Sequence, residues 1–171
     1  MNLTLTSTLF RRLSLLAFSL VAAIGFCADG TAPKWGKAAD NHIYAQKLVN
    51  ELMAAHPELL VVGLHTVAPG ASEQTMIATN LDRVGKADDD DDVAVYKERK
   101  MILVPNAKES NKFEVQMPML DATGKIIGAY GFVFLYKAGD DEVEILRKAK
   151  AIRAALAAQI PSHEALFKPM P

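Results

Sequence analysis

The residues most able to do chemistry lie at positions 75–93 (TMIATNLDRVGKADDDDDV), where an apolar run changes into charged side chains. Arg83 follows the apolar run, and five consecutive aspartates occupy positions 88–92. The planar guanidinium of an arginine can hold a carboxylate through two hydrogen bonds. Binding of a small charged solute is therefore the first chemistry to consider. A salt bridge from Arg83 to Asp82 or a nearby aspartate is the alternative.

The aspartate run fails the pattern of a calcium-binding loop. Asp88, Asp90 and Asp92 match the first, third and fifth ligand positions of an EF-hand. Val93, however, stands where that loop needs glycine, and Arg99 stands where it needs a bidentate glutamate. The four histidines are scattered without a His-Glu-x-x-His motif, so no zinc pattern is present either. We expect a solvated acidic loop, no metal site and no cofactor.

The sequence also lacks the motifs of common enzymes. Catalysis by a nucleophile needs a base and an orienting group beside it. Ser72, Ser110 and Ser162 fall in predicted turns outside any Gly-x-Ser-x-Gly motif, and no glycine-rich phosphate loop is present. Cys27 is the only cysteine. We therefore expect no catalytic residues and a protein that is not an enzyme.

Two main helices and five strands are expected to position the charged segment. Apolar residues three or four apart predict a helix from Asp40 to His56, where Pro57 ends it. Apolar residues at the same spacing predict a last helix that begins at Asp140 or Asp141 and stops before Pro161. Strands are predicted at 59–67, 75–80, 101–104, 112–120 and 125–136, with a short helix at 93–100.

These elements predict an α+β fold with a five-stranded antiparallel sheet, a long N-terminal helix and a C-terminal helix. Residues 112–120 alternate between apolar and polar side chains, so one face of that strand should be exposed to solvent. Residues 125–136 (KIIGAYGFVFLY) are apolar on both faces. A strand of this kind belongs in the middle of a sheet that is covered on both sides.

The element order and two motifs resemble the extracytoplasmic Cache sensor domains, which have a PAS-like sheet. The first motif is IA at 77–78 followed by RVGK at 83–86 and the acid Asp88. The second is PMLDATGKIIGAYGF at 118–132, which is similar to the hairpin between the last two strands of such domains. The resemblance covers residues 37–158. It implies a pocket for a small solute over the sheet.

The chain departs from the Cache pattern in two respects. It has no second membrane span and no signalling region after the sensor-like part. It also lacks the tyrosine, arginine and tryptophan cluster of the amino-acid-binding members, since Trp35 precedes the first helix. The resemblance therefore implies a free-standing sensor-like domain.

A small polar ligand, such as a carboxylate or an amine, is expected above the sheet beside His65, Thr79, Arg83, Met117 and Tyr130. A core or edge histidine bonded to the backbone is the alternative interpretation of His65. Tyr130 belongs to an aromatic row that is more usual in a core under a helix. The alternative function is a periplasmic protein-interaction module without a small ligand, which docks on an envelope protein or on a second copy of the chain.

Residues 1–28 have the pattern of a secretory signal peptide. Arg11 and Arg12 precede an uncharged apolar run that is too short for a comfortable bilayer span. We expect cleavage near Gly25 or Ala28, with an uncleaved membrane anchor as the alternative. The mature chain would then have no transmembrane span and would lie in the periplasm.

The rest of the chain is long enough for one hydrophobic core. We expect a lead-in at 29–36, a single domain at 37–160 and a flexible tail at 161–171. The whole chain carries 19 basic and 20 acidic residues. It has no dense basic face and no aromatic residues interleaved with basic ones, so nucleic acid is not an expected partner.

Overall fold

A computed structural model of the chain describes residues 35–106 and 110–171. The predicted signal peptide, with both candidate cleavage positions, lies outside the described residues. Within the described ranges, no helix is both long enough and apolar enough to cross a membrane.

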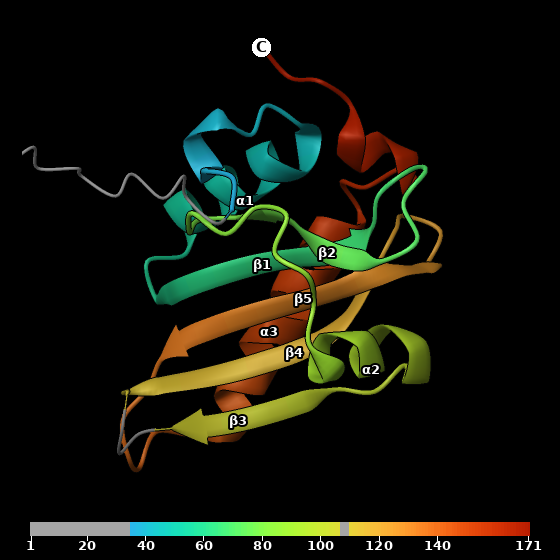
Figure 1. The fold of residues 1–171 in the computed structure, drawn as a ribbon. Helices are drawn as coiled ribbons and strands as arrows, with labels where there is room; N and C mark the ends of the chain where they lie inside the picture. The colour runs from blue at the N-terminus through green and yellow to red at the C-terminus, as the bar shows by residue number, and fades with distance from the viewer. Residues whose placement is uncertain (1–34, 107–109) are drawn as a thin grey trace, which may run out of the picture. The chain divides into compact units, whose positions relative to one another are not determined.

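The described chain contains one antiparallel sheet of five strands in the order β2-β1-β5-β4-β3 (Figure 1). The strands are β1 (Leu59–Val67), β2 (Gln74–Thr79), β3 (Ile102–Asn106), β4 (Lys112–Leu120) and β5 (Ile126–Leu135). β5 is the central strand, as its two apolar faces predicted. The α+β class and the five-stranded antiparallel sheet are confirmed.

Three α-helices cover the sheet: α1 (Tyr44–Ala55), α2 (Asp90–Glu98) and α3 (Glu142–Ala157). Figure 1 shows α3 behind the sheet and α2 in front of it. Side chains of α1 and α3 share one hydrophobic core with the rear face of the sheet. The front face carries α2 and the loop that leads into it.

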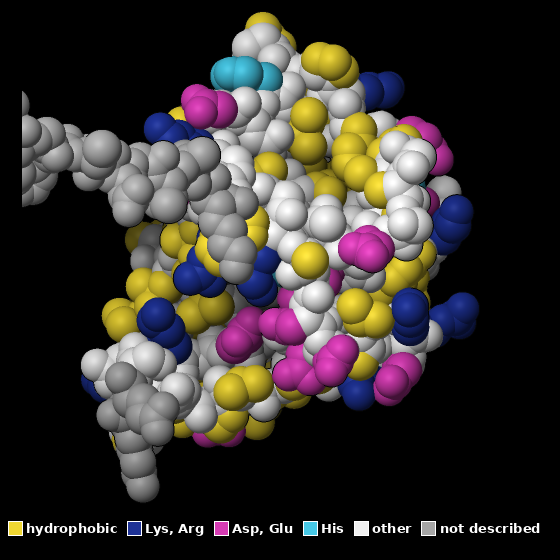
Figure 2. All heavy atoms as spheres, in the orientation of Figure 1, with side chains coloured by type: hydrophobic (Ala, Val, Ile, Leu, Met, Phe, Trp, Pro, Cys, Tyr) yellow, Lys and Arg dark blue, Asp and Glu magenta, His cyan; other side chains and the backbone are white. Residues whose placement is uncertain are grey.

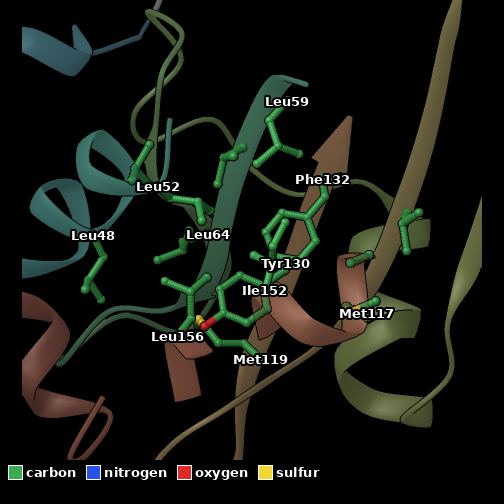
Figure 3. Close-up of a cluster of buried hydrophobic side chains, with 14 of the residues drawn as sticks. Leu48, Leu52, Leu59, Leu64, Met117, Met119, Tyr130, Phe132, Ile152 and Leu156 are labelled. Carbon is green, nitrogen blue, oxygen red and sulfur yellow. The ribbon is translucent and has the colours of Figure 1, made fainter. Parts of the chain in front are cut away.

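The core lies between the sheet and the pair α1 and α3 (Figure 3). Leu48 of α1 and Ile152 of α3 belong to it together with Leu64, Tyr130 and Phe132 of the central strands. The rings of Tyr130 and Phe132 are stacked, with centroids 5.1 Å apart. Burial of such side chains contributes about 1.5–3 kcal/mol each to folding.

The N-terminal helix is shorter than expected. A 3₁₀ helix at Ala38–Asp40 precedes it, and α1 then has 12 residues against 16 in α3. The chain does not run straight from one into the other, because the backbone of Asn41 and of Ile43 is extended; Asn41 Nδ2 donates to the carbonyl of Ile77 at 2.9 Å. The expectation of a long N-terminal helix is therefore not confirmed.

The last residues pack against the start of α1, where we had expected a flexible tail at 161–171. A second 3₁₀ helix, Glu164–Phe167, buries Leu166 completely. The amide of Met170 donates to the carbonyl of His42 at 2.9 Å, and the amide of Tyr44 donates to the carbonyl of Lys168 at 2.9 Å. These backbone bonds hold the end of the chain beside the domain.

The aspartate run begins a helix. Asp89 caps α2, because its side chain accepts a hydrogen bond from the amide of Asp92 at 3.3 Å. Asp90, Asp91 and Asp92 lie in the first turn, where negative charge interacts favourably with the helix dipole. The expectation of a solvated acidic loop is corrected here: the run forms a helix start whose last aspartate is buried.

Candidate functional site

A cavity of about 510 Å³ lies on the front face of the sheet, away from α1 and α3. Small-molecule pockets are typically about 300–1,000 Å³, so the volume suits a small solute. The floor comes from β1, β4 and β5, and the wall comes from the loop after β2 and from the start of α2. The lining includes Val61, Gly63, His65, Arg83, Lys86, Asp89, Asp92, Lys112, Glu114, Gln116, Gly131 and Val133.

Two glycines lie side by side in the floor. Gly63 of β1 and Gly131 of β5 are direct partners in the antiparallel register. A Cβ atom on Gly63 would lie 2.6 Å from Nε2 of His65, whereas a Cβ atom on Gly131 would lie 3.8 Å from that nitrogen and from Oε1 of Glu114. The missing side chain at Gly63 thus leaves room for the imidazole on the sheet.

His65 reaches this place because successive side chains of β1 point to opposite faces of the sheet. Leu64 enters the rear core, and His65 faces the cavity. The register of β1 with β2 shifts here, because Leu64 pairs with Ala78 and His65 with Met76, which leaves Ile77 of β2 as the extra residue of a bulge. Bulges re-aim side chains and are frequent near functional sites.

His65 forms a buried cluster with two residues of the aspartate run. Its Nδ1 lies 2.7 Å from Oδ1 of Asp88 and 3.5 Å from Oδ2 of Asp92. The side chains are 5%, 1% and 8% exposed, respectively. One ligand atom from each residue lies within 4.8 Å of the others, so the three could hold one metal ion.

The cluster shifts the pKa values of two of its members. Burial opposes charge on His65, but the hydrogen bond and charge of Asp88, with the charge of Asp92, outweigh it and raise the pKa of His65. Burial raises the pKa of Asp92 to about 6; His65 opposes this shift, whereas Asp88, Asp89 and Glu114 add to it. The folded site therefore takes up protons more readily than the isolated side chains would.

Charged side chains of both signs surround the cavity. Figure 2 shows Lys and Arg side chains grouped beside Asp and Glu side chains on this face. Arg83, Lys86 and Lys112 line the cavity together with Asp89 and Glu114. Such a mixture can orient a solute that carries a carboxylate, an amine or both.

Arg83 itself has no carboxylate within 4.0 Å among the residues that the structure describes. Its guanidinium carbon lies 6.0 Å from the centre of the Trp35 ring, at the outer limit of a cation–π contact. The expected alternative, a salt bridge to Asp82, is not formed: Asp82 accepts the amide of Ala38 at 3.2 Å. The guanidinium is thus free of an acidic partner in the described part of the chain.

Of the five side chains expected to hold a ligand, two line this cavity and three do not. His65 and Arg83 line it. Met117 and Tyr130 lie in the rear core, because they alternate along β4 and β5 with residues that face the front. Thr79 is fully buried, and its backbone exchanges hydrogen bonds with the side chain of Gln46 in α1. The expectation that all five form one pocket is therefore corrected.

Several cavity residues were absent from the sequence-based set. Glu114 and Gln116 lie on the wet face of β4, and the alternation of residues 112–120 had placed them there without linking them to the site. The sequence around Gly63 and Gly131 does not distinguish a glycine in a cavity floor from any other glycine in a strand. Asp88 and Asp92 had been noticed, but only as part of a solvated loop.

No protein-family model matches the sequence, and no curated protein matches it. Solved structures similar to the chain include the GAF domain of an Acinetobacter phosphoenolpyruvate-protein phosphotransferase, at 14% identity and a TM-score of 0.49 over 75% of this chain and 85% of that one. A protein described as a GAF sensor from Burkholderia vietnamiensis is 13% identical, with a TM-score of 0.47 over 75% of this chain and 78% of that one. These likenesses concern the arrangement of sheet and helices, and they are to GAF domains rather than to Cache domains.

A third similar structure is an enzyme, a type II free methionine-R-sulfoxide reductase from Thermoplasma acidophilum. It is 16% identical, with a TM-score of 0.46 over 71% of this chain and 92% of that one. The structures similar to this chain thus include an enzyme, and the expectation that this protein is not an enzyme is corrected accordingly.

Proposed function

We propose that this protein is an exported, sensor-like domain that binds a small polar solute, a carboxylate or an amine, in the cavity on the front face of the sheet. The observation that supports this proposal most directly is the cavity of about 510 Å³ between the sheet and the start of α2. A filled core at this place would have favoured a purely structural role. The exported location rests on the signal-peptide pattern at residues 1–28.

The charges at the cavity support a solute with at least one charged group. Arg83 offers a planar, permanently charged donor without an acidic partner among the described residues, which suits a carboxylate. Glu114 offers an acceptor for an amine from the opposite, sheet side of the cavity. The Cache resemblance of residues 77–88 is part of this proposal, because it implies a solute pocket next to the same segment.

A thermal-shift screen of small carboxylates and amines tests the proposal. We expect at least one compound to raise the melting temperature, because a ligand that binds only the folded state stabilises it. Arg83→Ala should weaken that compound by about tenfold or more, in keeping with the loss of a charge-assisted bond. Arg147→Ala, on the exposed side of α3, is the matched control. Failure of every compound, or equal affinity in Arg83→Ala, would contradict the proposal.

A second candidate function is docking on an envelope protein or on a second copy of the chain. It is favoured by the edge strand β3, in which Leu103 and Val104 are 40% and 42% exposed, and by Met101 directly before it, which is 40% exposed. The last helix does not offer such a surface through its main apolar stripe, because that stripe packs in the core. Sedimentation tests this candidate: Leu103→Lys should dissociate a dimer that Leu135→Lys leaves intact, and a wild-type monomer would rule out self-association.

A further inference from the structure

We propose that His65, Asp88 and Asp92 form a binding site for one divalent transition-metal ion, for which Zn²⁺ is the best-fitting probe. Imidazole nitrogen and carboxylate oxygen are both ligands of Zn²⁺, and three protein ligands with one open position are a common arrangement. This inference goes beyond the proposed function, because the ion can bind whether or not a solute does.

The two distances from His65 to the aspartates are close to those of a metal site. Ligand atoms about 2.1 Å from a tetrahedral ion lie about 3.4 Å from each other, and at a right angle they lie about 3.0 Å apart. The separation from His65 Nδ1 to Asp92 Oδ2 is 3.5 Å and needs no change. The separation from His65 Nδ1 to Asp88 Oδ1 is 2.7 Å and needs to open only slightly when an ion replaces the shared proton.

When both carboxylates are ionised, the charges of the cluster do not balance without a further cation. Asp88 and Asp92 together carry two negative charges when ionised, and His65 can supply at most one positive charge. No Lys or Arg in the described ranges lies within 4.0 Å of either carboxylate; the nearby Lys86 is paired at 3.9 Å with the exposed Asp89. Buried charge that lacks a partner is costly, and a divalent ion would neutralise it.

Unpartnered oxygen atoms at the cluster provide an independent observation. Four buried side-chain N or O atoms of the described chain lack a hydrogen-bond partner, and three of them are the acceptors Asp88 Oδ2, Gln74 Oε1 and Gln116 Oε1. The Asp88 side chain is 1% exposed and belongs to the cluster itself. Buried acceptors are normally satisfied by a donor, a water or an ion.

The other two of these acceptors belong to glutamines that contact the cluster or line the cavity beside it. Gln74 Nε2 donates to the backbone carbonyl of Asp92 at 3.3 Å, which fixes the amide beside the cluster. Gln116 lines the same cavity as His65 and Asp92, and its Nε2 donates to Glu114 at 3.2 Å. An ion with bound water would supply the donors that these oxygens lack.

The cluster also has an open side. His65 and Asp92 border the main cavity, whereas Asp88 borders a second cavity of about 280 Å³ next to Gln74. An ion held by the three side chains would therefore face the main cavity with its remaining position.

Calorimetric titration of the metal-stripped full chain with Zn²⁺, in the presence of a weak competing chelator, tests the site. We expect one ion per chain, with Asp92→Asn weakening binding by about tenfold or more. Asp90→Asn is the matched control, because Asp90 lies on the same first turn of α2 but outside the cluster and the cavity lining. Ca²⁺, which prefers six to eight oxygen ligands, should not displace Zn²⁺.

A second measurement does not depend on any variant folding. Saturating Zn²⁺ should raise the melting temperature of the wild-type chain, because an ion that binds only the folded state stabilises it. The proposal is overturned if Zn²⁺ neither binds nor stabilises the wild type. It is also overturned if Asp92→Asn, folded by circular dichroism, binds as tightly as the wild type, or if Ca²⁺ binds in place of Zn²⁺.

Discussion

The imidazole of His65 lies against Gly63, so close that a methyl group on Gly63 would come within 2.6 Å of Nε2. The two residues belong to the same face of β1, and the glycine leaves the space that the ring occupies. The position of the ring and its bond to Asp88 therefore depend on the absence of one side chain.

Gly63→Ala should displace His65 and break its bond to Asp88. We expect a loss of about 1–3 kcal/mol in the free energy of unfolding, the usual cost of leaving a buried hydrogen-bonding group without its partner. Gly131→Ala is the matched control, since its methyl group would meet only ordinary contacts at 3.8 Å. Urea denaturation of both variants measures the difference, and equal stability of the two would contradict this account of the cavity floor.

The buried cluster should make stability depend on pH. The pKa of Asp92 is raised from 3.8 to about 6, and that of His65 is also raised, so these two groups bind more protons in the folded chain than in the unfolded chain. The stability contributed by Asp92 is fully present below pH 3.8 and is lost as the pH rises through about 6. His65 acts in the same direction at higher pH, above its ordinary pKa of 6.5.

Asp92→Asn removes one of these titrations. In the presence of a chelator, the wild-type free energy of unfolding should fall relative to that of Asp92→Asn between about pH 4 and about pH 7. Urea denaturation across this range measures both chains. Parallel pH profiles would show that Asp92 has an ordinary pKa in the folded state.

The aspartate cap of α2 should add measurably to the free energy of unfolding. Asp89→Ala removes the side-chain acceptor of the Asp92 amide and should cost about 1 kcal/mol. Asp91→Ala, in the same turn but without a capping bond among the described residues, is the control and should cost clearly less. The comparison is read from urea midpoints, and an Asp89→Ala midpoint equal to that of the control would contradict the capping role.

The side chain of Gln46 joins α1 to β2. Its Nε2 donates to the carbonyl of Thr79 at 2.8 Å, and its Oε1 accepts the amide of Thr79 at 3.2 Å. Gln46→Ala would leave both backbone groups buried without partners, which should cost about 2 kcal/mol or more. Gln159→Ala, an exposed position near the end of α3, is the control in the same thermal unfolding assay. A melting temperature no lower than that of the control would contradict this role.

The sequence predicted the sheet well, because strand periodicity is a local property. The boundaries of β1 and β4 agree with the predicted ranges 59–67 and 112–120, and the apolar faces of β5 placed it at the centre. The start of α2 was missed, because consecutive aspartates resemble a solvated loop unless the helix cap is seen.

The site could be predicted only in part. Alternation shows that Tyr130 and Gly131 face opposite sides, but it does not show which side is open when both are apolar. Tyr130 and Met117 were consequently placed on the wrong side of the sheet. The pair His65 and Asp88 is separated by 23 residues, and only the fold shows that these two side chains meet.

The most direct test of the binding cavity is a ¹H–¹⁵N NMR titration with a small carboxylate or amine that raises the melting temperature. The account predicts that the amide signals of Gly63 and Gly131 shift together with that of Arg83, because all three residues line the cavity. The signals of Thr79 and Tyr130, which do not line it, should stay nearly unchanged. Shifts confined to the rear face, or no shift at either glycine, would contradict the account.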